Sequence, residues 1–388
     1  MSACIVGWAH MPFGKHDTED YESMAVRVAR QAIAHAGIGA KDIDQIFLGL
    51  YNAGLDRQDF PASLVLQSDD ALRFKPATRV ENACATGSAA VYQGLSAIAA
   101  RRARFVLVVG LEKMSHVAPD VLGGVLMKAS YVKEEAASYG SFVELFGHLA
   151  RRYFQHYGDQ SDALARIAAK NHKNGVANPY AHMRKDLGYA FCRTESEKNP
   201  MVAPPLKRTD CSLVSDGAVA LVLADSDAAL AMERAVLFRA AQQVNDFLPM
   251  SRRDALQLEG CAVAWQRAFA EAGVGLDDLD VVETHDCFTV AELMQYEAMG
   301  LTPPGQGAQA ILEGWTEMGG RLPVNPSGGL KSKGHPIGAT GVSMHVLGAM
   351  QVAGDAGAFQ VPGAALAGVF NMGGTAVANY CSILEPLR

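Results

Sequence analysis

Ala36-Gly37-Ile38-Gly39 is a stretch that this sequence nearly repeats, as Ala272-Gly273-Val274-Gly275. The residues that follow repeat as well, because Asp42-Ile43-Asp44-Gln45-Ile46 corresponds to Asp278-Leu279-Asp280-Val281-Val282 at the same offset. Each copy is typical of a helix end, a turn and then a strand. A repeat that agrees with the surrounding element order predicts two similar halves in one chain.

The segments around the first copy alternate between helix and strand patterns. Apolar spacing predicts helices at residues 23–35 and 91–103, and continuous apolar runs predict buried strands at 44–51, 105–110 and 217–224. Strands that are apolar throughout need helices on both faces of their sheet. We therefore expect an α/β fold built from two duplicated halves.

The middle of the chain departs from this alternation. Residues 116–207 combine helical and irregular stretches rich in Met, Tyr, His and basic side chains. We interpret this segment as an inserted, loop-rich domain. The N-terminal half then comprises residues 1–115 and is completed by 208–234, and the C-terminal half comprises 235–388.

The composition is that of an ordinary globular enzyme. Of 388 residues, 49% are hydrophobic and 19% are charged, and the net charge of -7 argues against a nucleic-acid surface made by overall basicity. Seven cysteines show no CxxC or Cys/His spacing, so we expect no disulfide framework, no metal site and a cytoplasmic location. No apolar run approaches the length of a membrane span, so no membrane partner is expected.

One cysteine stands among very small residues directly before a helical run. It lies in Asn82-Ala83-Cys84-Ala85-Thr86-Gly87, ahead of the helix expected at 91–103. Backbone N–H groups at a helix N-terminus favour a thiolate, so Cys84 is a candidate nucleophile whose pKa should be lowered. The alternative is a free cysteine that serves as a small core residue.

The duplication places a histidine opposite this cysteine. The counterpart of the Cys84 loop is Gly334-His335-Pro336-Ile337-Gly338-Ala339-Thr340-Gly341, which precedes a helix expected at 342–352. A helix N-terminus disfavours imidazolium, so His335 would stay neutral and could take the thiol proton. Cysteine beside such a base is the arrangement of an activated nucleophile, whereas a lone loop histidine would only cap a helix.

Two more loops follow strands of the second half. His285-Asp286-Cys287-Phe288 comes after an apolar strand at 279–282, and Asn371-Met372-Gly373-Gly374 comes after one at 365–370. Open α/β sheets place their ligands at the carboxyl ends of strands. The glycines can bring a backbone N–H to an oxyanion, although Cys287 could be a core residue and the glycine pair a plain turn.

These four motifs together resemble the thiolase family, over essentially the whole chain. The Gly-His-Pro-Ile-Gly-Ala-Thr-Gly stretch is highly specific, and His-Asp-Cys-Phe is similar to the sterol-carrier-protein subgroup of thiolases. The resemblance implies a five-layered αβαβα fold from two duplicated halves, with an inserted loop domain over the active site. It also implies CoA thioester substrates, no permanently bound cofactor, and a homodimer or homotetramer.

The resemblance also implies roles for particular residues. Cys84 matches the nucleophile that becomes acylated, and His335 matches the base that activates it. His285 occupies the position whose side chain usually orients a water in the oxyanion hole for the thioester enolate. The backbone N–H groups of Cys84 and Gly373 would form a second hole at the acyl carbon.

The chain departs from the common family pattern at one position. Where most thiolases carry a second catalytic cysteine in a Cys-x-Gly loop, this sequence has Asn371-Met372-Gly373. Asparagine cannot shuttle a proton at neutral pH. The subgroup resemblance makes Cys287 the substitute, with the general acid/base role at the substrate α-carbon.

CoA phosphates need cations, and the inserted segment offers several. We expect contacts from His172 and Lys173, and Phe288 and Phe146 are candidates to line the pantetheine or acyl tunnel. The further basic candidates are Arg151, Arg152, Lys170, Arg184 and Lys185. The alternative for each basic residue is that it lies on a solvated face of a helix.

The predicted activity is that of a thiolase acting in lipid metabolism by ping-pong chemistry on 3-oxoacyl-CoA. Two alternatives lie within the superfamily, a retro-aldol cleavage of a CoA thioester and an acyl transfer that needs a small accessory protein. A third alternative is a non-catalytic acyl-CoA-binding protein.

Overall fold

The computed structural model describes residues 3–387. In that range nine strands form one hydrogen-bonded sheet in the order β3-β2-β4-β7-β1-β8-β11-β10-β9. The sheet has a seam at its centre, where β1 (Ala3–His10) pairs with β8 (Val236–Asn245) through Cys4–Leu237 and Ile5–Val236. It therefore consists of two half-sheets, one from each half of the chain.

The two halves share the order helix, strand, helix and two strands, and they differ in that the first half adds strand β3 and the second half adds helix α11. The first half contains α1 (Tyr21–His35), β2 (Gln45–Gly49), β3 (Ala77–Val80), α3 (Thr86–Ala99), β4 (Phe105–Glu112) and β7 (Gly217–Asp225). The second half contains α10 (Glu259–Ala272), β9 (Val281–Thr284), α11 (Thr289–Ala298), α14 (Ile337–Ala353), β10 (Ala367–Gly373) and β11 (Ala378–Pro386).

The structure confirms the predicted duplication. After α1 the chain reverses at Gly37, with φ +69°, and after α10 it reverses at Gly273, with φ +66°. Both glycines hold the left-handed conformation that ends a helix, which is why the repeated stretch carries them. From the seam outwards, β1, β7, β4 and β2 of the first half-sheet mirror β8, β11, β10 and β9 of the second, and β3 is an additional edge strand of the first.

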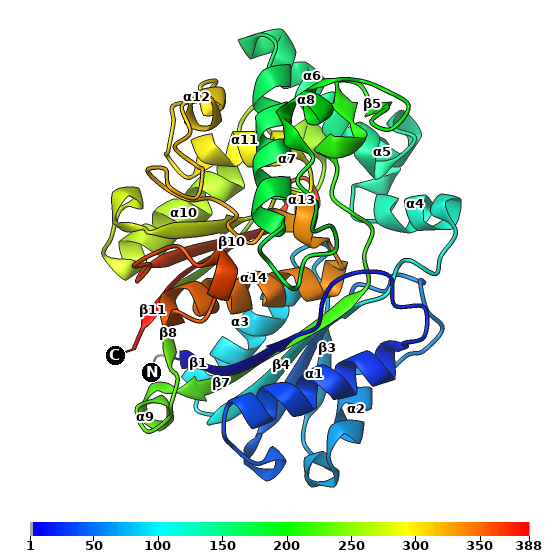
Figure 1. Cartoon of the computed structure of the whole chain (residues 1–388). Helices are drawn as coiled ribbons and strands as arrows, with labels where there is room; N and C mark the ends of the chain where they lie inside the picture. The colour runs from blue at the N-terminus through cyan, green and yellow to red at the C-terminus, as the bar shows by residue number, and fades with distance from the viewer. Residues whose placement is uncertain (1–2, 388) are drawn as a thin grey trace.

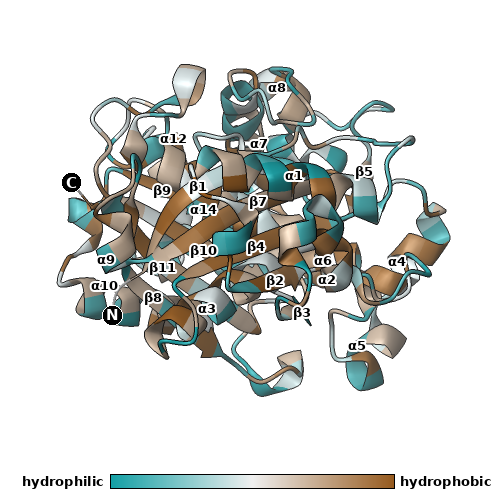
Figure 2. Cartoon of the chain, turned by 90° about the horizontal axis from the view of Figure 1, so that it is seen from below, coloured by the Kyte–Doolittle hydropathy of each residue, from teal (hydrophilic) through white to brown (hydrophobic). Residues whose placement is uncertain are grey.

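The layers follow from which helices cover which sheet face. Helix α1 packs outside the first half-sheet and α10 outside the second, while α3 and α14 lie between the two (Figure 1). This arrangement confirms the expected five layers. Hydrophobic residues concentrate in the central strands and in α14 (Figure 2), because α14 is covered by sheets on both sides.

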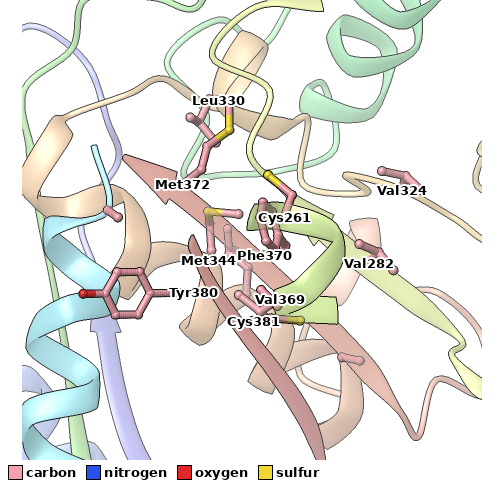
Figure 3. Packing of buried hydrophobic residues seen from close by; sticks show 14 of the residues in the cluster. Cys261, Val282, Val324, Leu330, Met344, Val369, Phe370, Met372, Tyr380 and Cys381 are labelled. Carbon is pink, nitrogen blue, oxygen red and sulfur yellow. The ribbon is translucent and has the colours of Figure 1, made fainter. Parts of the chain in front are cut away.

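The core of the second half shows how closely these layers pack. Phe370 of β10 and Cys381 of β11 pack on the α10 side of the sheet, where Cys381 lies near Cys261, and Met344 belongs to α14 (Figure 3). All four side chains are fully buried. Burying such side chains contributes roughly 1.5–3 kcal/mol each to folding.

Residues 116–207 carry more helix than the sequence predicts. They contain α4 (Pro119–Met127), α5 (Val132–Ser138), α6 (Phe142–Tyr157), α7 (Ser161–Gly175), α8 (Gly188–Arg193), β5 (Met201–Ala203) and β6 (Leu206–Lys207). Helix α7 packs against α11, against α12 (Gly307–Leu312) and against α13 (Gly329–Lys333), above the second half-sheet (Figure 1). The limits of this segment as a separate domain stay a prediction.

Two expected helices begin earlier than their apolar spacing suggests. The helix expected at 91–103 starts at Thr86, and the one expected at 342–352 starts at Ile337. The first turn of α3 is Thr-Gly-Ser-Ala, and in α14 Gly, Ala and Thr follow Ile337, so both first turns carry little apolar periodicity. Along residues 3–387 the structure has no helix of the length and apolarity that crossing a membrane requires.

The two central helices touch backbone to backbone at these glycine-rich first turns. A Cβ atom at Gly87 of α3 would lie 2.6 Å from the backbone nitrogen of Val342 in α14. One at Gly341 would lie 2.6 Å from the side-chain oxygen of Asn371. A larger residue at either position would push the helices apart.

We expect Gly87→Ala to lower the free energy of unfolding by about 1–3 kcal/mol, because its methyl group would meet fixed backbone atoms. Gly123→Ala is the matched control, since an added Cβ on that α4 glycine has nothing within 4 Å. It should be neutral or stabilise by about 1 kcal/mol. Denaturant titration of both variants measures the difference, and equal stabilities would contradict this tight contact.

Candidate active site

Four loops meet at the first turns of α3 and α14. Cys84 precedes α3, His335 precedes α14, His285 follows β9, and Asn371 lies near the end of β10. The sulfur of Cys84 and one ring nitrogen each of His285 and His335 all lie within 4.8 Å of one another. The structure thus brings together the residues that the four motifs predict.

Burial is the main influence on the pKa of the Cys84 thiol. The residue is 6% exposed, and burial raises the pKa of its thiol to about 12, with Glu112 and Glu81 adding to the effect. Hydrogen bonds from the backbone N–H groups of Gly374 and Cys84 lower the pKa by less. The lowered pKa expected from the helix N-terminus is therefore wrong for the unliganded site, because desolvation outweighs the helix.

His335 has one nitrogen bound and one free. Its Nδ1 lies 2.7 Å from Oγ1 of Thr340, and that hydroxyl donates its single hydrogen to the carbonyl of Pro336 at 2.9 Å. Nδ1 must therefore carry the proton, so Nε2 keeps its lone pair. Nε2 is buried and has no hydrogen-bond partner in the part of the chain that the structure describes.

Cys84 and His335 thus form a neutral pair at rest. Burial, with help from the charge of Lys333, lowers the pKa of His335 to about 3, while the Cys84 thiol keeps its proton. Nε2 of His335 can accept that proton when substrate arrives.

His285 and Asn371 occupy neighbouring strands. Nδ1 of His285 lies 2.8 Å from Nδ2 of Asn371, and both residues are fully buried. The His285 ring stands nearly perpendicular to that of His335, with the ring centroids 5.2 Å apart. Gln295 donates to the His285 carbonyl at 2.7 Å and fixes the backbone there.

Buried carboxylates that the sequence analysis did not single out hold these loops in place. Asp286 accepts from the backbone N–H of Leu330 at 2.6 Å and from the Asn171 amide at 2.7 Å. Glu112 accepts from backbone N–H groups of the first half and, at 3.0 Å, from that of Gly338 in α14. Burial raises the pKa of each to about 7. Their sequence signal, one acidic residue in an apolar run, resembles that of many surface residues.

Cys287 lies beside the nucleophile. It is buried, lines the same cavity as Cys84, and its thiol pKa is raised well above normal by burial and by the nearness of Cys84. Its carbonyl accepts from the backbone N–H of Ser212 at 2.9 Å. A neutral thiol in this position can donate a proton to a developing carbanion.

The cavity in front of Cys84 is apolar and small, about 130 Å³. Its walls include Tyr51, Leu126 and Phe288. Phe146 does not line it as expected. Its ring instead stacks on that of Phe288 from behind, with 4.3 Å between centroids. The cavity therefore suits an acyl group.

A larger cleft of about 660 Å³ adjoins this cavity and shares five wall residues with it, Val143 and residues 211–214. The cationic residues of the cleft are Lys185, Lys198, Arg208 and Lys331, and His172 lies beside them. Lys198 and Arg208 were missed by the sequence analysis, because single basic residues on exposed stretches carry no local signal.

Most of the other basic residues predicted to contact CoA phosphates do not line this cleft. Lys170 is fully buried and pairs with Glu292 at 2.8 Å, so it cannot meet a phosphate. Lys173 pairs with Glu317 at 3.8 Å and is not among the residues that line the cleft. Arg151 donates to the carbonyl of Pro204 at 2.6 Å.

Two further arginines are likewise not among those that line the cleft. Arg152 borders a separate pocket beside α5, and Arg184 donates to the carbonyl of Val176. Of the basic residues predicted to contact CoA phosphates, His172 and Lys185 line the cleft.

The backbone donor nearest to the nucleophile is one residue beyond the predicted one. Gly374, with φ +62°, gives the backbone hydrogen bond to the Cys84 sulfur. A Cβ atom at Gly373 would lie 2.6 Å from the carbonyl oxygen of Asn82, so this position also requires close approach. The assignment of the second oxyanion hole to Gly373 stays a prediction.

Comparison with protein families identifies both halves. The thiolase N-terminal domain matches residues 3–227, and a thiolase C-terminal domain-like unit matches residues 242–386. The acetyl-CoA acetyltransferase of Methanothermobacter thermautotrophicus is 33% identical over 373 residues, which are 96% of each chain. Sterol carrier protein 2 of Homo sapiens is 32% identical over 376 residues, covering 93% of this chain and 67% of that protein.

Solved structures share the fold. An Ltp2-ChsH2(DUF35) aldolase aligns with a TM-score of 0.84 at 22% identity, covering 100% of this chain and 98% of that one. Human mitochondrial 3-ketoacyl-CoA thiolase in complex with CoA aligns with a TM-score of 0.76 at 16% identity, with coverage of 100% and 98%.

We expect the alkylation rate of Cys84 by iodoacetamide to rise steadily with pH between 7 and 9, without a plateau. A thiol pKa of about 12 leaves the thiolate a small fraction that grows tenfold with each pH unit. Peptide mass spectrometry follows the label, and a Cys84→Ser variant gives the background. A plateau near neutral pH would instead show a resting thiolate–imidazolium pair.

Proposed function

The chain belongs to the thiolase family, and on that premise we propose that it is a CoA-dependent thiolase of the sterol-carrier-protein type. It would cleave or form 3-oxoacyl-CoA through an acyl-cysteine. The observation that carries this proposal is the meeting of Cys84, His335 and His285 within 4.8 Å, at an apolar cavity that Cys287 also lines.

In the degradative direction the first step forms the acyl-enzyme. Nε2 of His335 takes the proton of Cys84, and the sulfur attacks the 3-keto carbon of the substrate. The bond between C2 and C3 then breaks, and its electron pair forms the enolate of acetyl-CoA. His285 and the protonated His335 face the enolate oxygen, and Cys287 gives its proton to C2.

The second step releases the acyl group. A new CoA thiol loses its proton to the Cys287 thiolate and attacks the acyl-cysteine carbonyl. The tetrahedral oxyanion collapses, the new acyl-CoA leaves, and His335 returns the proton to Cys84. Both thiols regain their protons, which suits a buried site where a lasting thiolate would be costly.

The cleft and cavity together match the two ends of a CoA thioester. Lys185, Lys198 and Arg208 are exposed on the cleft and can meet phosphates, and the thioester would pass the shared wall at residues 211–214. The acyl chain would then lie against Phe288. CoA therefore acts as a substrate in this proposal, and no permanently bound cofactor is needed.

The same proposal includes a homodimer or homotetramer in the cytoplasm, with a role in lipid β-oxidation. Strand β3 lies at the edge of the sheet, and Phe74, just before it, is 85% exposed. An open edge beside an exposed aromatic ring supports pairing with a second copy.

A retro-aldolase that works with an accessory protein is the second candidate. The observation in its favour is the fold that this chain shares with the Ltp2-ChsH2(DUF35) aldolase, whose name joins two proteins. A retro-aldol cleavage needs no acyl-cysteine. An acyl mass on Cys84 therefore separates the two candidates.

We expect Cys287→Ala to accept an acetyl group on Cys84 from acetyl-CoA while its thiolysis of acetoacetyl-CoA falls by about 10²–10⁴-fold. The reason is that a carbanion at the α-carbon needs a proton from Cys287, whereas the CoA thiol is acidic enough to leave as a thiolate without that proton. Loss of the 3-oxo absorbance measures thiolysis, and intact mass measures acylation.

Wild-type protein and Cys84→Ala are the controls for this experiment. Wild type should show both signals with some 3-oxoacyl chain length, and Cys84→Ala should show neither. Near-normal thiolysis by Cys287→Ala would remove Cys287 from the mechanism. The absence of acylation and turnover in wild type at every chain length would overturn the proposed function.

We expect Lys198→Ala to raise the KM for CoA about fivefold, since an exposed cation–phosphate contact contributes about 1 kcal/mol. Lys173→Ala is the matched control, because that lysine is exposed but is not one of the cleft residues. The effect of Lys198→Ala should shrink at high salt. A larger effect at Lys173 than at Lys198 would place the CoA phosphates elsewhere.

A further inference from the structure

We propose that Asn371 is a positioning residue that holds His285 in the tautomer protonated at Nε2. Nδ2 of Asn371 lies 2.8 Å from Nδ1 of His285, so an amide N–H there makes Nδ1 an acceptor. The single proton of the neutral ring then sits on Nε2, beside Cys84 and His335. The inference rests on the proposed function for its chemistry, but not for its geometry.

The orientation of the Asn371 amide follows from its other two contacts. Nδ2 lies 3.3 Å from the carbonyl oxygen of Cys84, and Oδ1 lies 2.8 Å from the hydroxyl of Ser88. A flipped amide would place its oxygen against the Cys84 carbonyl, two acceptors facing each other. The hydroxyl of Ser88 can donate to Oδ1, so the observed orientation satisfies all three groups.

The Asn371 amide packs closely against α14. A Cβ atom at Gly341 of α14 would lie 2.6 Å from Oδ1 of Asn371. Strand β10 pairs in parallel with β9 and places Phe370 opposite Thr284, so the next residues along, Asn371 and His285, are neighbours. Packing and register thus fix the amide against the imidazole.

The buried Nε2 of His285 has no hydrogen-bond partner among residues 3–387. A buried donor without a partner costs about 1–3 kcal/mol, so its retention points to a ligand atom that completes it. The ring is kept neutral by burial and by the nearby His335 and Lys333, which together lower its pKa well below normal. The neutral ring therefore carries one N–H, and the hydrogen bond from Asn371 determines which of its two nitrogens carries that proton.

The two histidines become complementary in this arrangement. Nε2 of His335 is an acceptor at rest, while Nε2–H of His285 is a donor. After His335 takes the Cys84 proton, both rings donate toward the space between them, where an enolate oxygen needs two donors. A proton on Nε2 of His285 also leaves that nitrogen without a lone pair for a metal ion.

This role explains why asparagine can stand where most thiolases carry a cysteine. Proton transfer has moved to Cys287, and the vacated position now orients a ring. His285 then donates directly to the substrate oxygen, whereas the resemblance to the family implies a side chain that orients a water at this position.

Nitrogen-15 NMR of histidine-labelled protein tests the tautomer directly. We expect Nδ1 of His285 to be unprotonated and Nε2 to be protonated in the wild type, with the signal assigned by its loss in His285→Asn. Asn371→Asp replaces the amide donor by a carboxylate acceptor, so Nδ1 should gain a proton in that variant. A protonated Nδ1 in wild type, or an unprotonated Nδ1 in Asn371→Asp, would overturn the proposal.

Turnover gives a second measurement that a merely structural role would not predict. Asn371→Asp should lose about 100-fold in kcat, the effect of removing one oxyanion-hole donor, with the KM for CoA unchanged. An unchanged kcat with a shifted tautomer would overturn the positioning role. If wild type shows the Nε2–H tautomer but no thiolysis, the proposed function fails while the tautomer assignment stands.

Discussion

The contact between the first turns of α3 and α14 is the constraint on which the rest of this structure depends. Gly87 and Gly341 let two helices from different halves approach until backbone meets backbone. Cys84 precedes one helix and His335 the other, so the distance between nucleophile and base is set by how closely those helices pack. The five layers, the duplicated sheets and the seam between them all serve to hold this pair of helices.

So tight a contact removes water from the site, and this desolvation determines the protonation states of its residues. The Cys84 thiol and the His335 ring are both kept neutral by burial, and so are Cys287 and His285. Charge therefore has to be created during the reaction and met by groups already in place. Fixed N–H donors are effective for this purpose, because they need no rearrangement when the charge appears.

The sequence predicts the motif residues well because each lies at the end of an element whose pattern is local. The duplication places His335 opposite Cys84 without any knowledge of distances. It does not predict the direction of the Cys84 pKa shift, since burial is decided by distant segments. For the same reason it assigns Lys170 to a phosphate when the side chain is buried against Glu292, and it misses Lys198 on an exposed stretch.

The residues of the site are divided between the two halves of the duplication. The first half supplies Cys84, whereas His285, Cys287 and His335 all come from the second half. One half alone holds a nucleophile without its base, or a base without its nucleophile. The two halves must therefore face each other for the site to exist at all.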